Sequence, residues 1–390
     1  MHVRASGRRA TERPPRDDQR GSGAMLAVFL LGTLFILIST GLLLVQISQS
    51  GLKQQLRYHG QAVNAAQAGL VDGLAWFRRQ TTQPVATFAP QRDLTATPPV
   101  NETDDPTIGI VREYVVDANG LVWGRYEVPI SGVVDVTTNR AKSGTGTVWA
   151  LESRGYIYVR SDPSKRFDQP PNRVISRAVA RSEIQRLSIV LPANAAINAY
   201  RGDAVSTQTR TRVYGDNDIG IAYPASTGTP STSGELQGSP TRSQVDPYND
   251  SLSAVFGVTQ SELVAMADIV VNSTSELPAK LPDMALIVIN GNATFNAARR
   301  MTGTGVLVVF GNLLVEANSY SNYNGLIYVT GTYTQNAPSQ VSGSIISQGA
   351  VSIRGTGDFS EVFYDEAVLD QIKRHMGQYR FNRNQQISAR

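Results

Sequence analysis

The sequence predicts a chain of α+β and all-β class. A long amino-terminal transmembrane helix is followed by a small antiparallel sheet head and by a carboxy-terminal parallel β-solenoid with capping helices. Three observations support this prediction: an uncharged apolar run early in the chain, paired β-rich segments after residue 108, and glycines that recur at intervals of 20, 20 and 18 residues after residue 285. The predicted boundaries are 1–21 for a basic leader, 22–80 for the helix, 81–190 for the β head, 191–258 for a linker that could hold early solenoid coils, and 259–390 for a helix, the solenoid and its cap.

The apolar run extends from Ala24 to Val45 without a charged residue. At a rise of about 1.5 Å per residue, a helix of this length crosses a hydrocarbon core about 30 Å thick. The net charge of the whole chain is +4, and residues 1–20 supply +3 of it through six arginines against three acids. Positive charge beside a span keeps that end cytoplasmic. The sequence therefore predicts a single-pass membrane protein with its body exported, and the basic excess gives no support to nucleic-acid binding.

The helix is predicted to continue beyond the span as far as Gln80. Residues 46–80 contain no proline, and their apolar residues recur mostly every three, four or seven positions, which is typical of a helix with one apolar face. Pro84 then ends it. The second half of this helix is expected to lie on a soluble domain.

Two stretches of this region carry a family resemblance. Arg20-Gly21-Ser22 leads into the apolar run, and residues 64–79 read Asn-Ala-Ala-Gln-Ala-Gly-Leu-Val-Asp-Gly-Leu-Ala-Trp-Phe-Arg-Arg. The region 20–80 resembles the PilX-like minor pilins of type IV pilus systems. The resemblance implies cleavage by a prepilin peptidase after Gly21, or alternatively after Gly23, and packing of the helix with other pilins or pseudopilins in a filament core. It also implies insertion in the inner membrane, an inner-membrane assembly platform as a partner, and a pilin-like β head.

One departure from the family pattern suggests a position in the filament. Major pilins place a glutamate five residues into the mature chain, whereas the fifth residue after Gly21 is Leu26, and no acid occurs between Asp18 and Asp72. Minor pilins at a filament tip can lack that glutamate, because no earlier subunit lies above them. The resemblance therefore implies a tip or priming subunit of a type IV pilus or secretion pseudopilus.

Paired β-rich segments predict the head. Residues 109–116 and 121–128 flank a turn at 117–120, which indicates a hairpin. Residues 147–153 and 156–159 flank Arg154-Gly155 in the same way, and residues 173–181 alternate as a further strand. A small antiparallel sheet against the apolar face of the helix would bury both surfaces.

The second half of the chain contains a repeat. Residues 224–245 are rich in Ser, Thr, Gly and Pro and predict a loop or linker, and Thr259-Gln260-Ser261-Glu262 has the form of a capping box before a short helix. Short β-rich runs then each end at a glycine: Gly291, Gly311, Gly331 and Gly349. A constant period near 20 residues favours a parallel β-solenoid over the alternative, an antiparallel sandwich.

Two further features are assigned to the ends of the coils. Gly305, Gly325 and Gly343 are expected at the second corner of each coil. Residues 362–374 are expected to form a strand end and an amphipathic helix that covers the open end of the solenoid.

The residues that could support catalysis are scattered. Cysteine is absent, the three histidines are far apart, and the acids of the repeat, Asp283, Glu316, Asp358 and Glu361, are not in register. The sequence predicts no catalytic, cofactor or metal site, and therefore a structural protein. The alternatives are a membrane-anchored solenoid that self-assembles or binds glycans without being a pilin, and, less well supported, a solenoid enzyme acting on polysaccharides.

Overall fold

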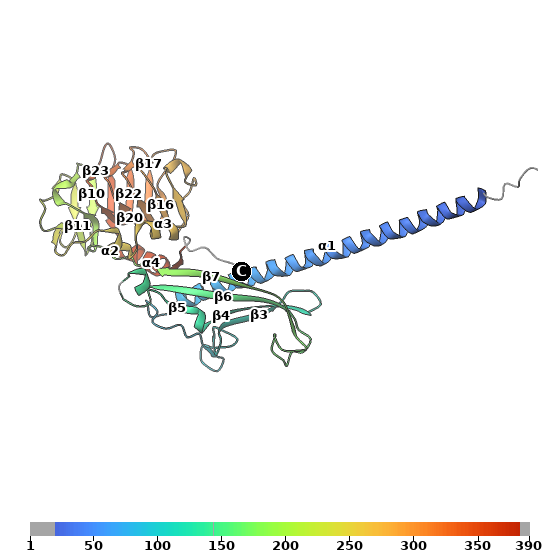
Figure 1. Ribbon diagram of the computed structural model, residues 1–390. Coiled ribbons are helices and arrows are strands. Elements are labelled where there is room, and N and C mark those ends of the chain that lie inside the picture. The colour runs from blue at the N-terminus through green and yellow to red at the C-terminus, as the bar shows by residue number, and fades with distance from the viewer. Residues whose placement is uncertain (1–19, 143, 383–390) are drawn as a thin grey trace, which may run out of the picture. The chain divides into compact units, whose positions relative to one another are not determined.

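A computed structural model describes residues 20–142 and 144–382 of the chain. The chain divides into two compact units, one ending at Gln61 and the other beginning at Ala62. The first unit holds residues 20–61 of helix α1 (Arg20–Arg79), and the second holds the end of this helix and the strands (Figure 1). Residues 1–19 of the predicted leader lie outside the described residues.

The predicted transmembrane helix is not supported. None of the helices in residues 20–142 and 144–382 combines the length and apolar character that crossing a membrane takes. The predicted membrane span from Ala24 to Val45 and the predicted single-pass inner-membrane location are therefore wrong. That prediction depended on the absence of charge. Absence of charge is a weaker condition than continuous apolar character.

The end of α1 packs on an antiparallel sheet with the strand order β25-β7-β6-β4-β3, and β5 pairs with β6. A short β1-β2 ribbon and two 3-10 turns lie in the loops of this part of the chain. The bounds are β1 (Arg92–Asp93), β2 (Val100–Asn101), β3 (Gly109–Val115), β4 (Val122–Pro129), η1 (Ile130–Gly132), β5 (Val133–Asp135), η2 (Thr138–Arg140), β6 (Val148–Val159), β7 (Arg173–Arg186) and β25 (Tyr379–Phe381).

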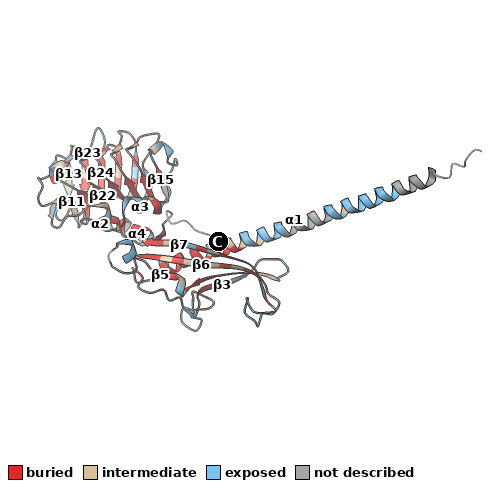
Figure 2. Cartoon of the chain, viewed as in Figure 1, coloured by how far each residue is buried: buried red, intermediate tan, exposed pale blue. Residues whose placement is uncertain are grey.

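The apolar face predicted for the second half of the helix is buried only from residue 62 onward. Ala66, Leu70 and Phe77 are at most 1% exposed and join the core of the antiparallel sheet, whereas Leu52 and Leu56 are 57% and 68% exposed. Figure 2 shows this change along α1 from exposed to buried residues. The sheet therefore explains the apolar pattern of α1 only over its last turns.

The first predicted hairpin is confirmed, because β3 and β4 pair antiparallel around the turn at 117–120. The turn predicted at Arg154-Gly155 is wrong, since β6 runs through both residues as one strand. Gly155 is small for a different reason: a Cβ atom there would lie 2.1 Å from the backbone oxygen of Ala62 and 2.5 Å from the backbone nitrogen of Ala66. It lets the α1 backbone rest directly on the sheet.

Residues 195–364 contribute two parallel sheets. In the larger sheet the main strand order is β13-β10-β24-β22-β20-β18-β16-β15, with β8, β11 and β14 joined beside β22. Its strands are β8 (Ala195–Ala199), β10 (Thr211–Tyr214), β11 (Ile219–Pro224), β13 (Glu235–Gln237), β14 (Arg242–Val245), β15 (Ile269–Val271), β16 (Ala285–Ile289), β18 (Thr302–Val309), β20 (Ser321–Val329), β22 (Ser339–Ser347) and β24 (Ser360–Tyr364).

The smaller sheet has the order β12-β9-β23-β21-β19-β17. Its strands are β9 (Val205–Thr207), β12 (Ser231–Thr232), β17 (Ala293–Phe295), β19 (Leu313–Val315), β21 (Tyr333–Asn336) and β23 (Val351–Arg354). Two 3-10 turns, η3 (Gly202–Ala204) and η4 (Thr274–Glu276), lie between strands of the two sheets along the chain. The loop or linker predicted for residues 224–245 is wrong, because β12, β13 and β14 fall within it and pair in parallel with β9, β10 and β11.

The predicted fold class is wrong for this part of the chain as well, because the described residues form two open sheets and no closed solenoid. A solenoid adds its coils in chain order, but here β8, β9 and β10 pair with β22, β23 and β24, which come some 150 residues later in the chain. The reason is that the chain beyond β24 turns away into a helix. The backbone edges of β22 and β23 therefore pair with the earlier strands β8 and β9.

Gly305, Gly325 and Gly343 were expected at corners, but they lie inside β18, β20 and β22 as direct register partners. Their φ angles are 144°, 153° and 138°, and a Cβ atom on Gly325 would lie 2.0 Å from the backbone oxygen of Gly305. Only glycine combines this backbone conformation with such a close approach. The three glycines therefore let three neighbouring strands approach closely at the same level of the sheet.

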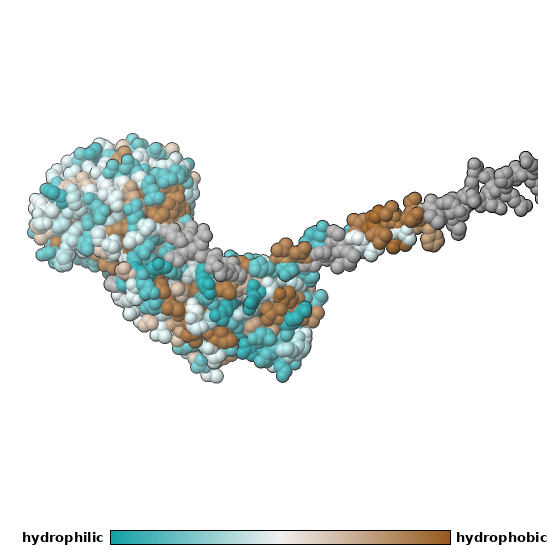
Figure 3. Space-filling model, in the orientation of Figure 1, coloured by the Kyte–Doolittle hydropathy of each residue, from teal (hydrophilic) through white to brown (hydrophobic). Residues whose placement is uncertain are grey.

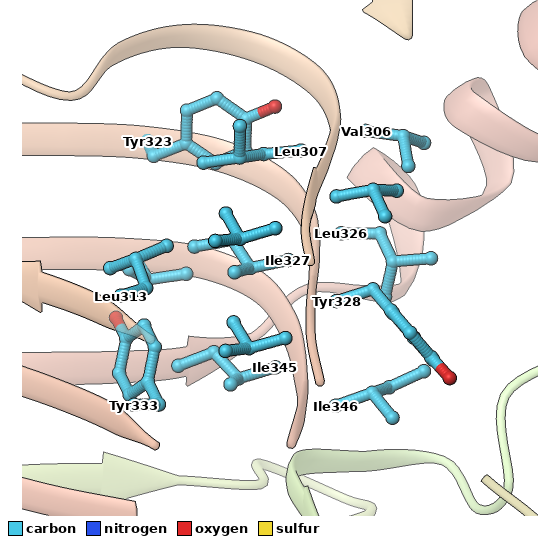
Figure 4. Close-up of a cluster of buried hydrophobic side chains, with 14 of the residues drawn as sticks. Val306, Leu307, Leu313, Tyr323, Leu326, Ile327, Tyr328, Tyr333, Ile345 and Ile346 are labelled. Atoms are coloured by element: carbon cyan, nitrogen blue, oxygen red, sulfur yellow. The ribbon is translucent and has the colours of Figure 1, made fainter. Parts of the chain in front are cut away.

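Three helices cover the larger sheet: α2 (Leu252–Phe256), α3 (Gln260–Met266) and α4 (Glu366–Met376). In Figure 4, Leu307, Ile327 and Ile345 point to one side of the sheet, and Leu326 and Ile346 point to the other side, where a helix lies. The strands β18, β20 and β22 contact α4. The expectation that this helix covers an open end of the strands is therefore wrong, because the apolar side chains that need cover lie on the face of the sheet.

The chain returns to the antiparallel sheet after α4. Strand β25 pairs antiparallel with β7, and Tyr379 is register partner of Arg186. Residues 187–378, which hold the two parallel sheets, are thus an insertion between two neighbouring strands of the antiparallel sheet. Tyr379 is 0% exposed, and its ring centroid lies 5.1 Å from that of Phe77 on α1.

The capping box of α3 is confirmed. The Thr259 hydroxyl accepts from the Glu262 backbone N–H, and the Glu262 carboxylate accepts from the Thr259 N–H at 2.7 Å. The Lys142 ammonium also donates to this carboxylate, at 2.6 Å. Burial opposes ionisation of Glu262, but the hydrogen bonds from Lys142 and from the Thr259 backbone outweigh it and hold the pKa of the carboxyl below its usual range.

Glu262→Gln should reduce the free energy of unfolding by about 1 kcal/mol at pH 7, because glutamine preserves the capping geometry and loses the ion pair with Lys142. Because the folded pKa is lowered, the contribution is complete above the unfolded pKa of about 4.3 and disappears as the pH falls through the folded value. Urea unfolding at pH 7 and at pH 3 measures it. Glu316→Gln, at an exposed acid, is the control, and an equal effect of both variants at pH 7 would contradict the prediction.

Candidate functional site

The candidate functional surface is the apolar segment of α1, residues 28–42. Its large apolar side chains are between 53% and 73% exposed: Val28, Phe29, Leu30, Leu31, Leu34, Phe35, Ile36, Leu37, Ile38 and Leu42. Figure 3 shows such apolar residues along α1 in brown. Since four consecutive residues, 28–31, are included, the exposed apolar surface surrounds the helix and is not one stripe.

The two threonine hydroxyls of the apolar segment are already satisfied within the helix. The Thr33 hydroxyl donates to the Phe29 carbonyl at 2.9 Å, and the Thr40 hydroxyl donates to the Ile36 carbonyl. No charged residue occurs between Arg20 and Lys53. The segment therefore offers neighbours mainly apolar contact, with threonine hydroxyls that make no demand for an outside partner.

The residues predicted for processing and for the span all fall within α1: Gly21, Gly23, Ala24 and Val45. The surroundings of their side chains lie outside what the structure describes. Cleavage after Gly21, or alternatively after Gly23, therefore stays a prediction.

Polar contacts fix the far end of α1 to the antiparallel sheet. The Tyr126 hydroxyl donates to the Asp72 carboxylate at 3.1 Å, and the Arg112 guanidinium lies 3.9 Å from the same carboxylate. Burial raises the pKa of Tyr126, and the negative charge of Asp72 raises it further. The Trp76 indole N–H donates to the Glu102 carboxylate at 2.9 Å. These contacts hold the end of α1 from Ala62 onward against the rest of its own unit.

The sequence identified the helix but missed most of its attachment. Gly69, Gly73 and Gly155 all lie where helix and sheet are in contact: a Cβ atom on Gly69 would overlap the Ser153 side chain, and one on Gly73 would lie 3.0 Å from Leu151. Glycines at 69 and 73 are spaced one helical turn apart, which was a usable signal for a close-packed helix face. Tyr379 also contacts the end of α1, since its backbone carbonyl accepts from Arg78. It lies 300 residues after the helix, and no sequence signal indicated this contact.

The described residues contain no cluster of metal-binding side chains that would support a catalytic role. Among the described residues, no three His, Cys, Asp or Glu side chains come close enough to share a metal ion. His59 lies on α1 and His375 on α4. The arrangement of the apolar segment is suited to packing against other helices and offers no group that could act on a substrate.

Comparisons with known proteins add little to this geometry. No protein-family model and no curated protein matches the chain. Among solved structures, the crystal structure of the competence-associated pilin ComZ from Thermus thermophilus matches with 13% sequence identity, covering 86% of this chain and 98% of that chain, at a TM-score of 0.20. At so low a TM-score the likeness supports no inference about this chain.

Proposed function

We propose that the chain is a structural, pilin-like subunit that assembles with other pilins or pseudopilins through the apolar segment of α1. The observation that supports this most strongly is the contrast along one helix. Residues from Ala62 onward are packed into a sheet, while Leu34, Phe35 and Leu37 are 57–73% exposed. Apolar side chains exposed on all sides of a helix have to be covered by several neighbours at once, as in a bundle of like helices.

We also propose that the subunit lies at or near the filament tip, or primes assembly. Between Arg20 and Val71 the helix carries no acidic residue. A carboxylate in an apolar bundle costs several kcal/mol unless a partner pairs with it. A helix without one needs no amine from a subunit above it, which suits the terminal position.

Processing completes the proposal. Cleavage by a prepilin peptidase after Gly21, or alternatively after Gly23, would place the apolar segment close to the new amino terminus. The peptidase and a pilus assembly platform are the further partners proposed. The role is structural and not enzymatic, since the proposed surface acts only by packing.

Phe35→Glu should reduce incorporation of the subunit into filaments of its host by at least about tenfold, because packing would bury an unpaired carboxylate. Filaments are sheared, purified and quantified with an antibody against the head. The same preparation gives the copy number and position by immunogold labelling, and mass spectrometry shows whether the subunit begins at Ser22 or Ala24. A tip subunit should label filament ends only.

The matched control is Leu94→Glu, which makes the same change at a side chain that is 56% exposed and outside α1. It should leave incorporation unchanged. Equal incorporation of the Phe35→Glu variant and the unaltered protein would reject assembly through the apolar segment. Labelling along the whole filament shaft in stoichiometric amounts would reject the tip position alone.

A further inference from the structure

The chain contains three asparagines that are followed by glycine: Asn119-Gly120, Asn290-Gly291 and Asn324-Gly325. Such an asparagine can react with its own backbone, because glycine has no side chain that hinders the approach to its amide nitrogen. The dipeptide is the same in all three places. The surroundings of each pair in the fold therefore decide which of them reacts.

The first pair lies in the turn between β3 and β4 and has room to move. Asn119 and Gly120 are both exposed, and the Asn119 side chain makes no hydrogen bond within residues 20–142 and 144–382. A Cβ atom on Gly120 would meet nothing within 4 Å. The Gly120 backbone N–H donates to the Asp117 carbonyl at 3.2 Å, which is at the long end of the range for such bonds. The side-chain amide can therefore reach a backbone nitrogen that is only weakly held.

The third pair lies inside β20, which is paired on both sides. Asn324 is register partner of Thr304 on β18 and of Ser342 on β22. A Cβ atom on Gly325 would lie 2.0 Å from the backbone oxygen of Gly305. Because ring closure changes the backbone conformation, β20 would first have to separate from both neighbours. The sheet thus protects this pair.

The second pair has an exposed asparagine, but neighbouring backbone holds it. The Asn290 N–H donates to the Val271 carbonyl at 2.8 Å. A Cβ atom on Gly291 would lie 3.1 Å from the Asn272 carbonyl oxygen, and one on Gly311 would lie 2.6 Å from the Gly291 carbonyl oxygen. Backbone therefore lies close on two sides of this pair, whereas the turn at Gly120 is open.

We propose that Asn119 is a site of spontaneous deamidation. The Gly120 backbone nitrogen attacks the side-chain carbonyl carbon of Asn119, and a C–N bond forms as the bond to the side-chain amide nitrogen breaks. Ammonia leaves with the proton of the backbone nitrogen. Water then opens the cyclic imide at either carbonyl and returns a proton to the nitrogen, which gives aspartate or isoaspartate. One water is consumed for each ammonia released, and nothing is oxidised or reduced.

The product changes the end of the hairpin. The new carboxylate would share the turn with the Asp117 carboxylate, which accepts from the Val122 N–H at 2.8 Å. Isoaspartate also adds one carbon to the backbone of the turn. The Trp123 indole N–H donates to the Gly120 carbonyl at 2.9 Å, and the Arg160 guanidinium lies 4.5 Å from the Trp123 ring centroid. Like charge and a longer backbone would both weaken these contacts, so the modification would mark and loosen this end of β3 and β4.

The test is incubation of the full chain in mildly alkaline buffer, where loss of the proton from the backbone nitrogen is easier. Peptides are analysed at intervals by mass spectrometry, and isoaspartate is labelled with an isoaspartyl methyltransferase. Asn119 should react at least about a hundredfold faster than Asn324 and at least about tenfold faster than Asn290, because only the open turn needs no prior separation of strands. Equal rates at Asn119 and Asn324 in the folded chain would overturn the proposal. In denaturant the three rates should become similar, and an unchanged ranking there would also overturn it.

Variants separate the chemistry from folding. Gly120→Ala should slow the reaction at Asn119 at least about tenfold, because the methyl group obstructs the nitrogen. Gly144→Ala is the matched control and should leave the rate unchanged. Both glycines have a positive φ, of 70° and 85°, and a Cβ atom on either would meet nothing within 4 Å, so both variants carry similar strain. Undiminished deamidation in Gly120→Ala would overturn the proposal. The outcome is independent of filament assembly, because no residue of α1 takes part.

Discussion

Replacing Gly155 by alanine is expected to lower the free energy of unfolding by about 3 kcal/mol, although the change adds a single methyl group. The added Cβ would lie 2.1 Å from the Ala62 carbonyl oxygen and 2.5 Å from the Ala66 nitrogen. Both atoms belong to the helix backbone, so neither can rotate away as a side chain would. The helix has to lift from β6 as a whole. Guanidinium unfolding followed by circular dichroism measures the loss.

Gly60→Ala is the matched control, since a Cβ atom there would meet nothing within 4 Å. Alanine favours helix over glycine by up to about 1 kcal/mol, so this variant should be slightly more stable than the unaltered protein. Opposite signs for the same substitution at Gly155 and at Gly60, which lies two residues before Ala62 on α1, would identify the clash as the cause. A loss below about 0.5 kcal/mol for Gly155→Ala would show that the helix does not rest on β6 at this point.

The second large effect is expected for Tyr379→Ala, at about 3–5 kcal/mol. The ring is fully buried among the aromatic side chains of the antiparallel sheet core, 5.1 Å from Phe77. Its hydroxyl donates to the Gly146 carbonyl and accepts from the Val85 N–H at 2.9 Å. Tyr379→Phe retains the ring and leaves the Val85 N–H unpaired, while the Gly146 carbonyl still accepts from the Trp149 indole N–H, and should cost about 1–3 kcal/mol.

Tyr200→Ala serves as control for this series, because Tyr200 is 38% exposed and its loss should change the unfolding free energy by less than about 0.5 kcal/mol. Tyr200→Ala is therefore expected to be the most stable of the three variants, Tyr379→Phe less stable, and Tyr379→Ala the least stable. If Tyr379→Ala unfolds at the same denaturant concentration as the unaltered protein, β25 does not contribute to the stability of the sheet.

Local sequence signals identified elements well where neighbouring residues decide them. The turn at 117–120 and its flanking strands, and the capping box at Thr259, depend on residues at most a few positions apart. The strand from Arg173 was also predicted, although it continues to Arg186, beyond the alternation at 173–181. These predictions succeeded because turn chemistry and alternation act locally.

The positions of two glycines were predicted wrongly, because residues far away in the sequence determine their roles. Gly155 was expected in a turn, but it lies under a helix, and Gly325 was expected at a corner, but it lies inside β20. In both places the constraint is the close approach of another backbone, which a single sequence does not reveal. The order of strands failed for a related reason, since the pairing of β10 with β24 joins residues that no repeat relates.

The apolar segment could be recognised from amino-acid composition, but its surroundings could not be predicted. An apolar run without charge is plain in the sequence, but whether it meets the requirements of a membrane span depends on more than charge, and that prediction was wrong.

The insertion of residues 187–378 between β7 and β25 would allow this part of the chain to be replaced or lost. Arg186 and Tyr379 are register partners, so the inserted part begins and ends at one place. A short hairpin turn could join β7 to β25 directly and leave every other strand of the antiparallel sheet on its present route. The inserted residues 187–378 could therefore be exchanged without changing the order of strands in the antiparallel sheet. One and the same helix and sheet could present it, omit it, or present another domain in its place.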